Sequence, residues 1–332
     1  MNKTNCIRLG FTLAGVLVLV VLPARADTFG SGGNIFTIDF VDIGNPGNAD
    51  DVNNPYNNAG DQGTPFGGVG YTYRMGTYEI SEAQITKATA SGLANVTAGA
   101  HTGAQPAANM TWYEMAAFVN FLNTSTGHHA AYQINAGVTA LTLWSSAEAW
   151  QLDGEDLYRH KDAFYFLPSE DEWYKAAYHK NDGATANYWD YATGSNSAPT
   201  PVASGTAAGT AVYEGGGAAD PAAVNNAGGL SSYGTMGQDG NVWEKLEGAY
   251  TARTPPIDTS SDDRVDRGGA WFGAEVDLRS SYNNYHSFSW SASNIGFRVA
   301  SVPEPNSGLL LLGSGLTLLL RRRHAAVPSF RS

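Results

Sequence analysis

Residues 166–177 read FLPSEDEWYKAA and do more than any other stretch to define the fold. Ser169 and Glu172 fit a capping box, in which the hydroxyl accepts a backbone N–H of the first helical turn and the Glu reaches back to the N–H of the cap. Apolar residues then recur at helical spacing, at Trp173, Ala176 and Ala177. The stretch therefore predicts a short helix that begins at Ser169, buries one side and ends at the turn residues 181–183.

The same capping pattern occurs three more times along the chain. It is present at residues 81–84 (SEAQ), 111–114 (TWYE) and 145–148 (SSAE), and each is expected to begin a helix. After Thr111 the apolar residues again follow helical spacing, at Met115, Ala116, Val119 and Leu122. Four short helices are therefore expected.

Strand patterns lie in residues 34–41 and again after residue 240. Residues 34–41 alternate, with Phe36, Ile38 and Phe40 on one face, and predict a half-buried strand. Shorter candidates are residues 241–246, 264–272 and 296–302. Residues 44–70 are rich in Gly, Asn, Asp and Pro and predict a loop, whereas residues 188–230 predict either long ordered loops or partial disorder. This arrangement favours an irregular α+β fold.

The amino terminus has the features of a secretory leader. A positively charged start precedes an apolar stretch, and Ala24-Arg25-Ala26 is an A-x-A cleavage pattern, so residues 1–26 are expected to be removed as a signal peptide. The one cysteine, Cys6, would leave with this leader. A mature chain that begins near Asp27 would then have no disulfide and no thiolate ligand.

The carboxyl terminus resembles a PEP-CTERM sorting signal, expected over residues 302–324 with a short tail at 325–332. It begins with a turn-forming motif, Val302, Pro303, Glu304 and Pro305. An apolar helical stretch follows over residues 306–320, and a basic block, Arg321, Arg322 and Arg323, ends the signal. The resemblance implies that an exosortase of the inner membrane recognises the signal. The protein would pass through a membrane-anchored intermediate to the cell surface or biofilm matrix of a Gram-negative bacterium. The alternative is a plain C-terminal membrane anchor.

The charge balance narrows the possible partners. The chain carries 19 Lys and Arg against 31 Asp and Glu, a formal net charge of −12. Seven of the basic residues lie in the two terminal segments, so the body between them is strongly acidic. Such a surface repels nucleic acid and anionic lipid. It suits calcium or other cations, for which Asp42, Asp50, Asp51 and Asp61 are candidates, but acidity also serves solubility alone.

Six segments in order resemble the formylglycine-generating enzyme, or sulfatase-modifying factor, family. They are residues 73–81 (YRMGTYEIS), 110–116 (MTWYEMA), 166–177, 240–244 (GNVWE), 267–271 (RGGAW) and 294–298 (NIGFR). The resemblance covers a domain at residues 71–301, preceded by an N-terminal strand and loop at 27–70. It implies a compact, loop-rich variant of the C-type lectin fold, which the signal helix and the C-terminal apolar helix would flank.

The resemblance also implies a chemistry that this chain lacks. Catalytic members oxidise a substrate cysteine to formylglycine with oxygen and copper, which two cysteines bind. Gly273 and Leu278 stand at the matching positions, and neither supplies the soft sulfur that copper(I) prefers. We therefore expect no copper and no catalytic residue, and a binding or structural module whose partner is an extracellular polysaccharide or peptide.

Other family features suggest a metal and a ligand site. Calcium-binding members use carbonyls and a carboxylate that match Gly240, Val242 and Glu244. Gly237 replaces a further ligand, for which Asp239 could substitute from a different position. The alternative is that Glu244 forms an ion pair or a cap. The arginines Arg267, Arg279 and Arg298 are expected to pair with buried carboxylates. A ligand cleft is expected beside the lost cysteines, lined by Trp271, Tyr282, Asn283, Tyr285, His286 and Trp290.

One enzymatic alternative stays open at this point. The family also contains non-heme iron enzymes, so the chain could be a metal-dependent oxidoreductase with iron bound by His286 and Asp277. No histidine pair has helical metal-ligand spacing. The adjacent His128 and His129 are expected to point apart on the surface.

Overall fold

A computed structural model describes residues 25–52, 65–97, 99–250 and 263–303. The expected signal helix and C-terminal apolar helix lie outside these residues, as do Asp61, Glu304, Pro305 and the basic block 321–323. Within the described residues, no helix has both the length and the apolar character needed to cross a membrane.

A five-stranded sheet joins the two ends of the described chain. Its order is β1-β2-β3-β15-β8, and every neighbouring pair is antiparallel. The strands are β1 (Arg25–Phe29), β2 (Phe36–Ile43), β3 (Tyr73–Gly76), β15 (Ala300–Ser301) and β8 (Tyr165–Phe166). The C-terminal strand thus lies inside the sheet, between β3 and β8, and β1 and β2 share this sheet with strands of the domain that follows them.

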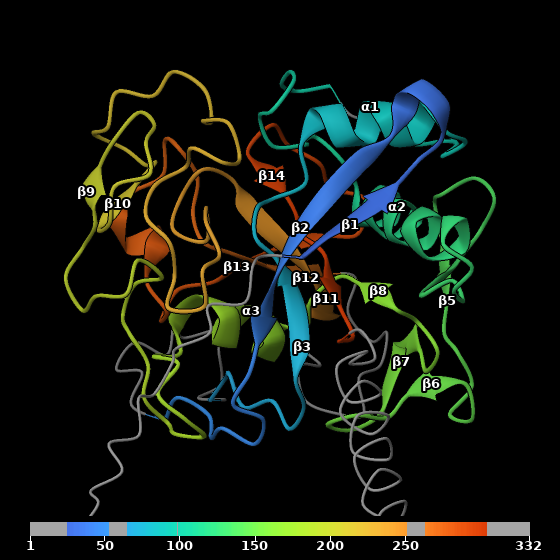
Figure 1. Cartoon of the computed structure of the whole chain (residues 1–332), viewed down its shortest axis with the longest axis horizontal. Helices are drawn as coiled ribbons and strands as arrows, with labels where there is room; N and C mark the ends of the chain where they lie inside the picture. Colours follow the sequence, from blue (N-terminus) through green and yellow to red (C-terminus); the bar gives the residue numbers. More distant parts are fainter. Residues whose placement is uncertain (1–24, 53–64, 98, 251–262, 304–332) are drawn as a thin grey trace, which may run out of the picture.

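The alternation over residues 34–41 correctly predicted β2. Phe36, Ile38 and Phe40 are buried on one face, and the strand extends two residues further to the buried Ile43. Phe36 stacks on Phe29 of β1, with ring centroids 5.5 Å apart. Burial of this face against α1 and α2, seen beside β1 and β2 in Figure 1, sets the register of the strand.

Three of the four expected helices form, each with both hydrogen bonds of a capping box. They are α1 (Glu82–Ala90) after Ser81, α2 (Trp112–Ser125) after Thr111, and α3 (Glu170–Tyr178) after Ser169. The expected stripe of α2 is fully buried, at Met115, Ala116, Val119 and Leu122.

The helix predicted at residues 145–148 was wrong. Ser145 Oγ donates to Glu148 Oε2 at 2.9 Å, but the chain makes only a turn. It then enters β6 (Ala149–Trp150), which pairs with β7 (Asp156–His160). Buried Trp150 joins the core from a strand, so tertiary pairing overrides the local cap.

A second sheet carries most of the residues discussed below. Its order is β13-β12-β11-β14, with strands β13 (Asn284–Ser287), β12 (Asp263–Arg267), β11 (Trp243–Ala249) and β14 (Ile295–Gly296). All seven residues of β11 are buried. The strand expected over 264–272 ends at Arg267, because Gly268 and Gly269 take positive φ values of 97° and 79°.

The remaining elements are short. Two-stranded pairs are formed by β4 (Gln133–Ile134) with β5 (Leu141–Thr142), by β6 with β7, and by β9 (Thr200–Pro201) with β10 (Thr210–Ala211). Short 3-10 helices are η1 (Gly32–Asn34) and η2 (Glu275–Leu278). Residues 188–230 run mainly as long loops around β9 and β10 (Figure 1). The expected loop-rich α+β class is confirmed.

Candidate functional site

The loop after β12 contains the two positions that match the family's cysteines. Gly273 donates its N–H to Ala270 O at 2.8 Å in a tight turn, and a Cβ placed on it would lie 2.8 Å from Asp277 Oδ2. Leu278 is fully buried in an apolar cluster with Tyr191, Ala211 and Tyr213. A glycine turn and a buried leucine therefore occupy the place of the thiol pair.

The same loop exposes apolar side chains on its outer side. Phe272 is 57% exposed and packs edge-on against Trp271, and Val276 is 41% exposed. Burial raises the pKa of Asp277 on the same loop, whose carboxylate accepts the N–H of Ala274. The loop thus offers contact surface where the family resemblance implies redox chemistry.

Glu244 lies at the centre of a buried ion-pair network. Its carboxylate accepts Nε of Arg298 at 2.5 Å, Nη2 of the same guanidinium, and the indole N–H of Trp173 at 2.7 Å. Glu79 lies nearby, where its two oxygens accept Nδ2 of Asn241 at 3.1 and 2.9 Å. Burial, followed by the charge of Glu244, raises the pKa of Glu79 well above its usual range.

Glu244, the expected side-chain ligand of calcium, is therefore engaged in protein contacts. A Cβ on Gly237 would lie 2.9 Å from Glu79 Oε2, so the Glu79 carboxylate fills the space beside the missing ligand. Asp239 turns away to accept the N–H groups of Ala192 and Thr193, and burial raises its pKa to about 7. Among the described residues, no three or more His, Cys, Asp or Glu are grouped to bind a metal ion. Calcium stays a prediction.

The three arginines differ in their surroundings. Arg298 and Arg267 are buried and pair with the buried carboxylates of Glu244 and Glu170. Arg279 pairs with Glu275 at 3.0 Å at a site that is about one-third exposed. The Arg267–Glu170 pair joins β12 to α3, and the Arg298–Glu244 pair joins the segment between β14 and β15 to β11, so their role is structural.

The six residues expected to line one cleft are distributed over several environments. Trp271 is buried edge-on against His101, Asn283 is buried with its amide 3.3 Å from Glu170 Oε1, and Tyr282 is partly buried beside Trp243. The other three are Tyr285, His286 and Trp290. Successive residues of a strand point to opposite faces, so Tyr285, which packs on Tyr250, and His286, which packs on Trp290, lie on different sides of β13.

His286 and Trp290 form the most distinctive exposed arrangement in the second sheet. His286 Nδ1 lies 2.5 Å from Oδ2 of Asp266, a fully buried carboxylate on β12. The His286 ring is stacked on Trp290, with centroids 5.6 Å apart and planes 10° apart. Nζ of buried Lys245 donates to the carbonyls of Ser287 and Trp290 at 3.3 and 3.0 Å. A histidine–carboxylate pair therefore lies beside a fixed, half-exposed indole.

Sequence reasoning missed Asp266 and Lys245. Both lie in expected strands, but the contact with His286 depends on the register that pairs Lys245 with Asp266 and Arg264 with His286. That register is not readable from the sequence. The structure places His286 on Asp266, whereas Asp277 lies on the separate loop at η2.

The remaining histidines occupy other settings. His128 stacks on Phe164, and His129 stacks on His160 with ring centroids 3.5 Å apart. The two adjacent side chains thus contact different partners. Burial, followed by the charge of His129, lowers the pKa of His160.

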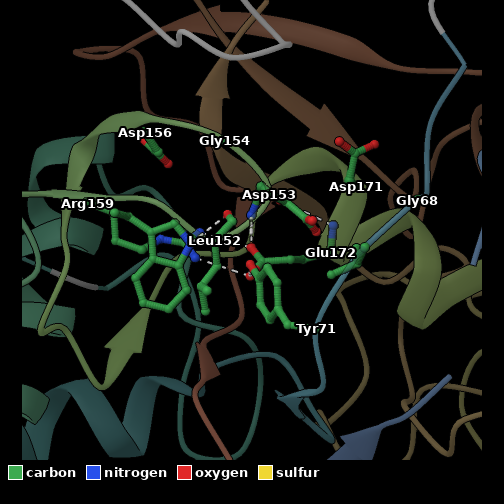
Figure 2. Close-up of a pocket in the computed structure, with 12 residues that line it drawn as sticks. Gly68, Tyr71, Leu152, Asp153, Gly154, Asp156, Arg159, Asp171 and Glu172 are labelled. Atoms are coloured by element: carbon green, nitrogen blue, oxygen red, sulfur yellow. Dashed lines mark hydrogen bonds and ion pairs between the residues drawn. The ribbon is translucent and has the colours of Figure 1, made fainter. Parts of the chain in front are cut away.

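A small cavity of about 50 Å³, lined by both polar and apolar side chains, lies between β7, the start of α3 and the chain before β3 (Figure 2). Nη2 of Arg159 contacts the carboxylates of Glu172 and Glu247 at 2.9 and 2.6 Å. In Figure 2 this guanidinium points toward Glu172, and Asp171 lies at another part of the lining. Burial raises the pKa of Asp171 to about 8. A cavity of this size holds a few water molecules and no sugar ring.

Comparison with known proteins agrees with this architecture. Residues 67–302 match the sulfatase-modifying factor enzyme 1-like domain. No curated protein sequence matches the chain. Among solved structures, Treponema denticola variable protein 1 is similar with a TM-score of 0.57 and 20% identity, over 84% of this chain and 99% of that one.

Two further structures share the fold. CarF has a TM-score of 0.52 and 18% identity, over 80% of this chain and 99% of that one. PvdO from Pseudomonas aeruginosa has a TM-score of 0.52 and 15% identity, over 83% of this chain and 98% of that one. At these identities the likeness concerns the fold, and it confirms the expected loop-rich, C-type-lectin-like architecture.

Proposed function

The chain belongs to the sulfatase-modifying factor enzyme 1-like domain family, and from that premise we propose that it is a non-catalytic binding module of the cell surface. In this proposal the leader exports the chain, an exosortase acts on the C-terminal signal, and the released domain binds an extracellular polysaccharide. The domain has kept the family's fold but uses it for contact instead of oxidation.

The loop after β12 is the observation that carries this proposal. Copper(I) requires soft sulfur ligands, and the matching positions hold Gly273 and Leu278. Leu278 is packed into an apolar cluster, and a side chain at Gly273 would meet the Asp277 carboxylate. Cys6, the one cysteine of the chain, belongs to the expected leader. Nothing in this loop is suited to bind the metal on which the family's oxidation depends.

Exposed aromatic side chains support a binding role. Phe272, Tyr285 and Trp290 are each about half exposed, and all three follow the RGGAW segment within twenty residues. Flat rings pack well on the apolar faces of sugar rings. The net charge of −12 opposes binding to anionic polymers and nucleic acid.

The expected sorting step suits the position of the last strand. β15 ends at Ser301, and Val302 donates one backbone hydrogen bond to Phe164 O at 3.0 Å. A cut near residues 303–305 would therefore leave every described strand in place. We expect mass spectrometry of the exported protein to show that residues 321–323 are lost, and an intact basic block would contradict the sorting step.

Pull-down with matrix polysaccharide from the producing cells tests the binding function. We expect the purified protein to sediment with the polysaccharide, and heat-denatured protein serves as the control. Failure to bind any matrix polysaccharide would count against the proposal. Formylglycine in a cysteine-containing peptide incubated with the protein, or oxygen uptake by a metal-loaded preparation, would overturn it in favour of an oxidoreductase.

A further inference from the structure

We propose that Trp290 and His286 form the subsite for one uncharged sugar ring, with Trp290 as the stacking surface and His286 Nε2 as a hydrogen-bond acceptor for a sugar hydroxyl. Asp266 and Lys245 act as positioning residues. This inference rests on the proposed binding function and names both the place and the class of ligand.

Asp266 determines which nitrogen of His286 carries the proton. A carboxylate can only accept, so Nδ1–H of His286 donates to Asp266, and in its neutral form the imidazole then presents a lone pair at Nε2. The carboxylate is fully buried and belongs to the neighbouring strand, so the ring cannot easily turn. His286 is itself about one-quarter exposed. The result is a fixed acceptor at the surface.

The Trp290 ring is also held in position before any ligand arrives. Lys245 Nζ holds the carbonyl of Trp290 at 3.0 Å and that of Ser287 at 3.3 Å, which fixes both ends of the short turn that carries the indole. The ring is parallel to His286 and remains 52% exposed. Because the indole is already oriented, little side-chain entropy is lost when a ligand stacks on it.

Asp266 indicates that the contact between its carboxylate and His286 has a role beyond filling space in the sheet. Its Oδ1 is buried and has no hydrogen-bond partner among the described residues. A buried acceptor without a partner lowers the stability of the folded protein. Such groups call for an explanation in function or in bound solvent. The cost is explained if the carboxylate is there to set the tautomer of His286.

The surrounding charges favour an uncharged ligand. Asp263 and Asp266 both belong to β12, whose register pairs Asp263 with Ser287 beside His286. The basic groups on this part of the sheet, Lys245 and Arg264, are fully buried, so they are not available to a uronate or sulfate. A sugar hydroxyl supplies the donor that Nε2 needs without adding negative charge.

Calorimetric titration with cellohexaose, an uncharged sugar chain, and with an alginate oligomer, a uronate chain, tests the proposal. We expect the protein to prefer cellohexaose. Trp290→Ala should weaken that binding about tenfold by removing the stacking surface. His286→Phe keeps a ring against Trp290 but loses the acceptor, and should weaken binding about three- to tenfold.

Asp266→Asn tests the tautomer directly. The amide of Asn can donate to Nδ1, which would move the imidazole proton to Nε2 and convert the acceptor into a donor. We expect weaker binding, and nitrogen chemical shifts of the imidazole should report the changed tautomer while the His286–Trp290 stack stays in place. Leu230→Ala, an exposed apolar change on the loop between β10 and β11, is the matched control and should bind as the unaltered protein does.

The outcomes of these titrations distinguish a failure of the Trp290–His286 subsite from a failure of the proposed polysaccharide-binding function. Binding of cellohexaose that falls in the Trp290 and His286 variants, while circular dichroism shows that both variants are folded at the temperature of the titration, supports the subsite. Equal binding in those variants, or a preference for alginate, overturns the subsite but leaves a polysaccharide-binding function in place. Absence of binding to either oligomer overturns the subsite; if matrix polysaccharide also fails to bind, the proposed function falls with it.

Discussion

Buried charge is the dominant feature at the scale of single residues. The Arg298–Glu244 pair is fully buried and shares its surroundings with Glu79, which is also buried. Removing one member of such a pair leaves an uncompensated charge, whereas a matched pair is close to neutral in its net contribution. These ion pairs therefore make the domain sensitive to single substitutions while adding little to its total stability.

We predict that Arg298→Met destabilises the protein by about 3–5 kcal/mol, because Glu244 would lose its counter-charge in the core. Urea unfolding followed by tryptophan fluorescence measures the change. Arg279→Met is the matched control: its partner Glu275 is about one-third exposed, so the loss should stay below about 1 kcal/mol. Equal losses for the two variants would contradict this view of the network.

Asp171 leads to a prediction about pH. Burial raises its pKa in the folded protein to about 8, far above that of an unfolded aspartate. The folded state therefore favours the protonated carboxyl, and stability falls as the pH rises from about 4 to about 8. The neighbouring charges that act on the carboxyl, those of Asp50, Glu170 and Glu172, raise its pKa further.

Asp171→Asn should accordingly stabilise the protein by roughly 1–3 kcal/mol at pH 8–9, and the gain should vanish near pH 4. The amide oxygen can still accept the N–H of Gly67, as Oδ1 of Asp171 does at 2.9 Å. Thermal melts across this pH range provide the measurement, with the exposed Asp220→Asn as control. A gain of the same size at every pH would show that burial of the charge is not the cause.

At the scale of elements, helix caps are the local signal that the fold uses most directly. Ser169 Oγ accepts the backbone N–H of Glu172 at 3.2 Å, and the backbone N–H of Ser169 donates to Glu172 Oε2 at 2.6 Å. The Glu172 carboxylate also contacts Arg159. The cap thus joins the start of α3 to the buried charges around the small cavity. Ser145 makes a similar side-chain contact with Glu148 but begins no helix.

We expect Ser169→Ala to cost about 1 kcal/mol of folding free energy, as the loss of an N-cap usually does. Ser145→Ala, in an exposed turn, should cost less than about 0.5 kcal/mol. Chemical denaturation of the two variants side by side gives the comparison. A larger loss at Ser145 would mean that the turn before β6 matters more to folding than the helix cap.

The same contrast shows what sequence patterns could predict here. Caps and alternation are local, so they correctly identified α1, α2, α3 and β2. They failed at residues 145–148, where the pairing of β6 with β7 prevents a helix. They also placed the end of β12 too late, because Gly268 and Gly269 have positive φ values and end the strand at Arg267. The contact between His286 and Asp266 depends on strand register, which no local pattern encodes.

For the whole molecule, the interior position of the last described strand is decisive. β15 pairs with β3 on one side and with β8 on the other, and Oγ of Ser301 accepts Nε of Arg74 at 2.9 Å. Two residues near the end of the described chain thus complete a sheet that begins at residue 25. The family resemblance predicted the overall fold, but it did not reveal this closure.

Truncation should therefore have a sharp threshold. We predict that a chain ending at Pro303 melts within about 2 °C of one ending at Val302, since neither loses a strand. A chain that ends at Arg298 should fail to give a cooperative transition, because removal of an interior strand leaves two open sheet edges. Circular dichroism melts of the three chains decide the point. A cooperative melt for the shortest chain would show that β15 is dispensable.

The pairing of β1 with β2 bears on when the expected leader could be removed. The bond between Ala26 and Asp27 lies within β1, paired with β2, and Asp27 contacts buried Arg74 at 2.7 Å and the hydroxyl of Tyr165 at 2.8 Å. A peptidase needs a loose, extended stretch of chain, so once this strand has docked the bond is shielded. If the leader is cut there, the cut has to come before the sheet is assembled. A precursor that folded too early would keep its leader for as long as it stayed folded.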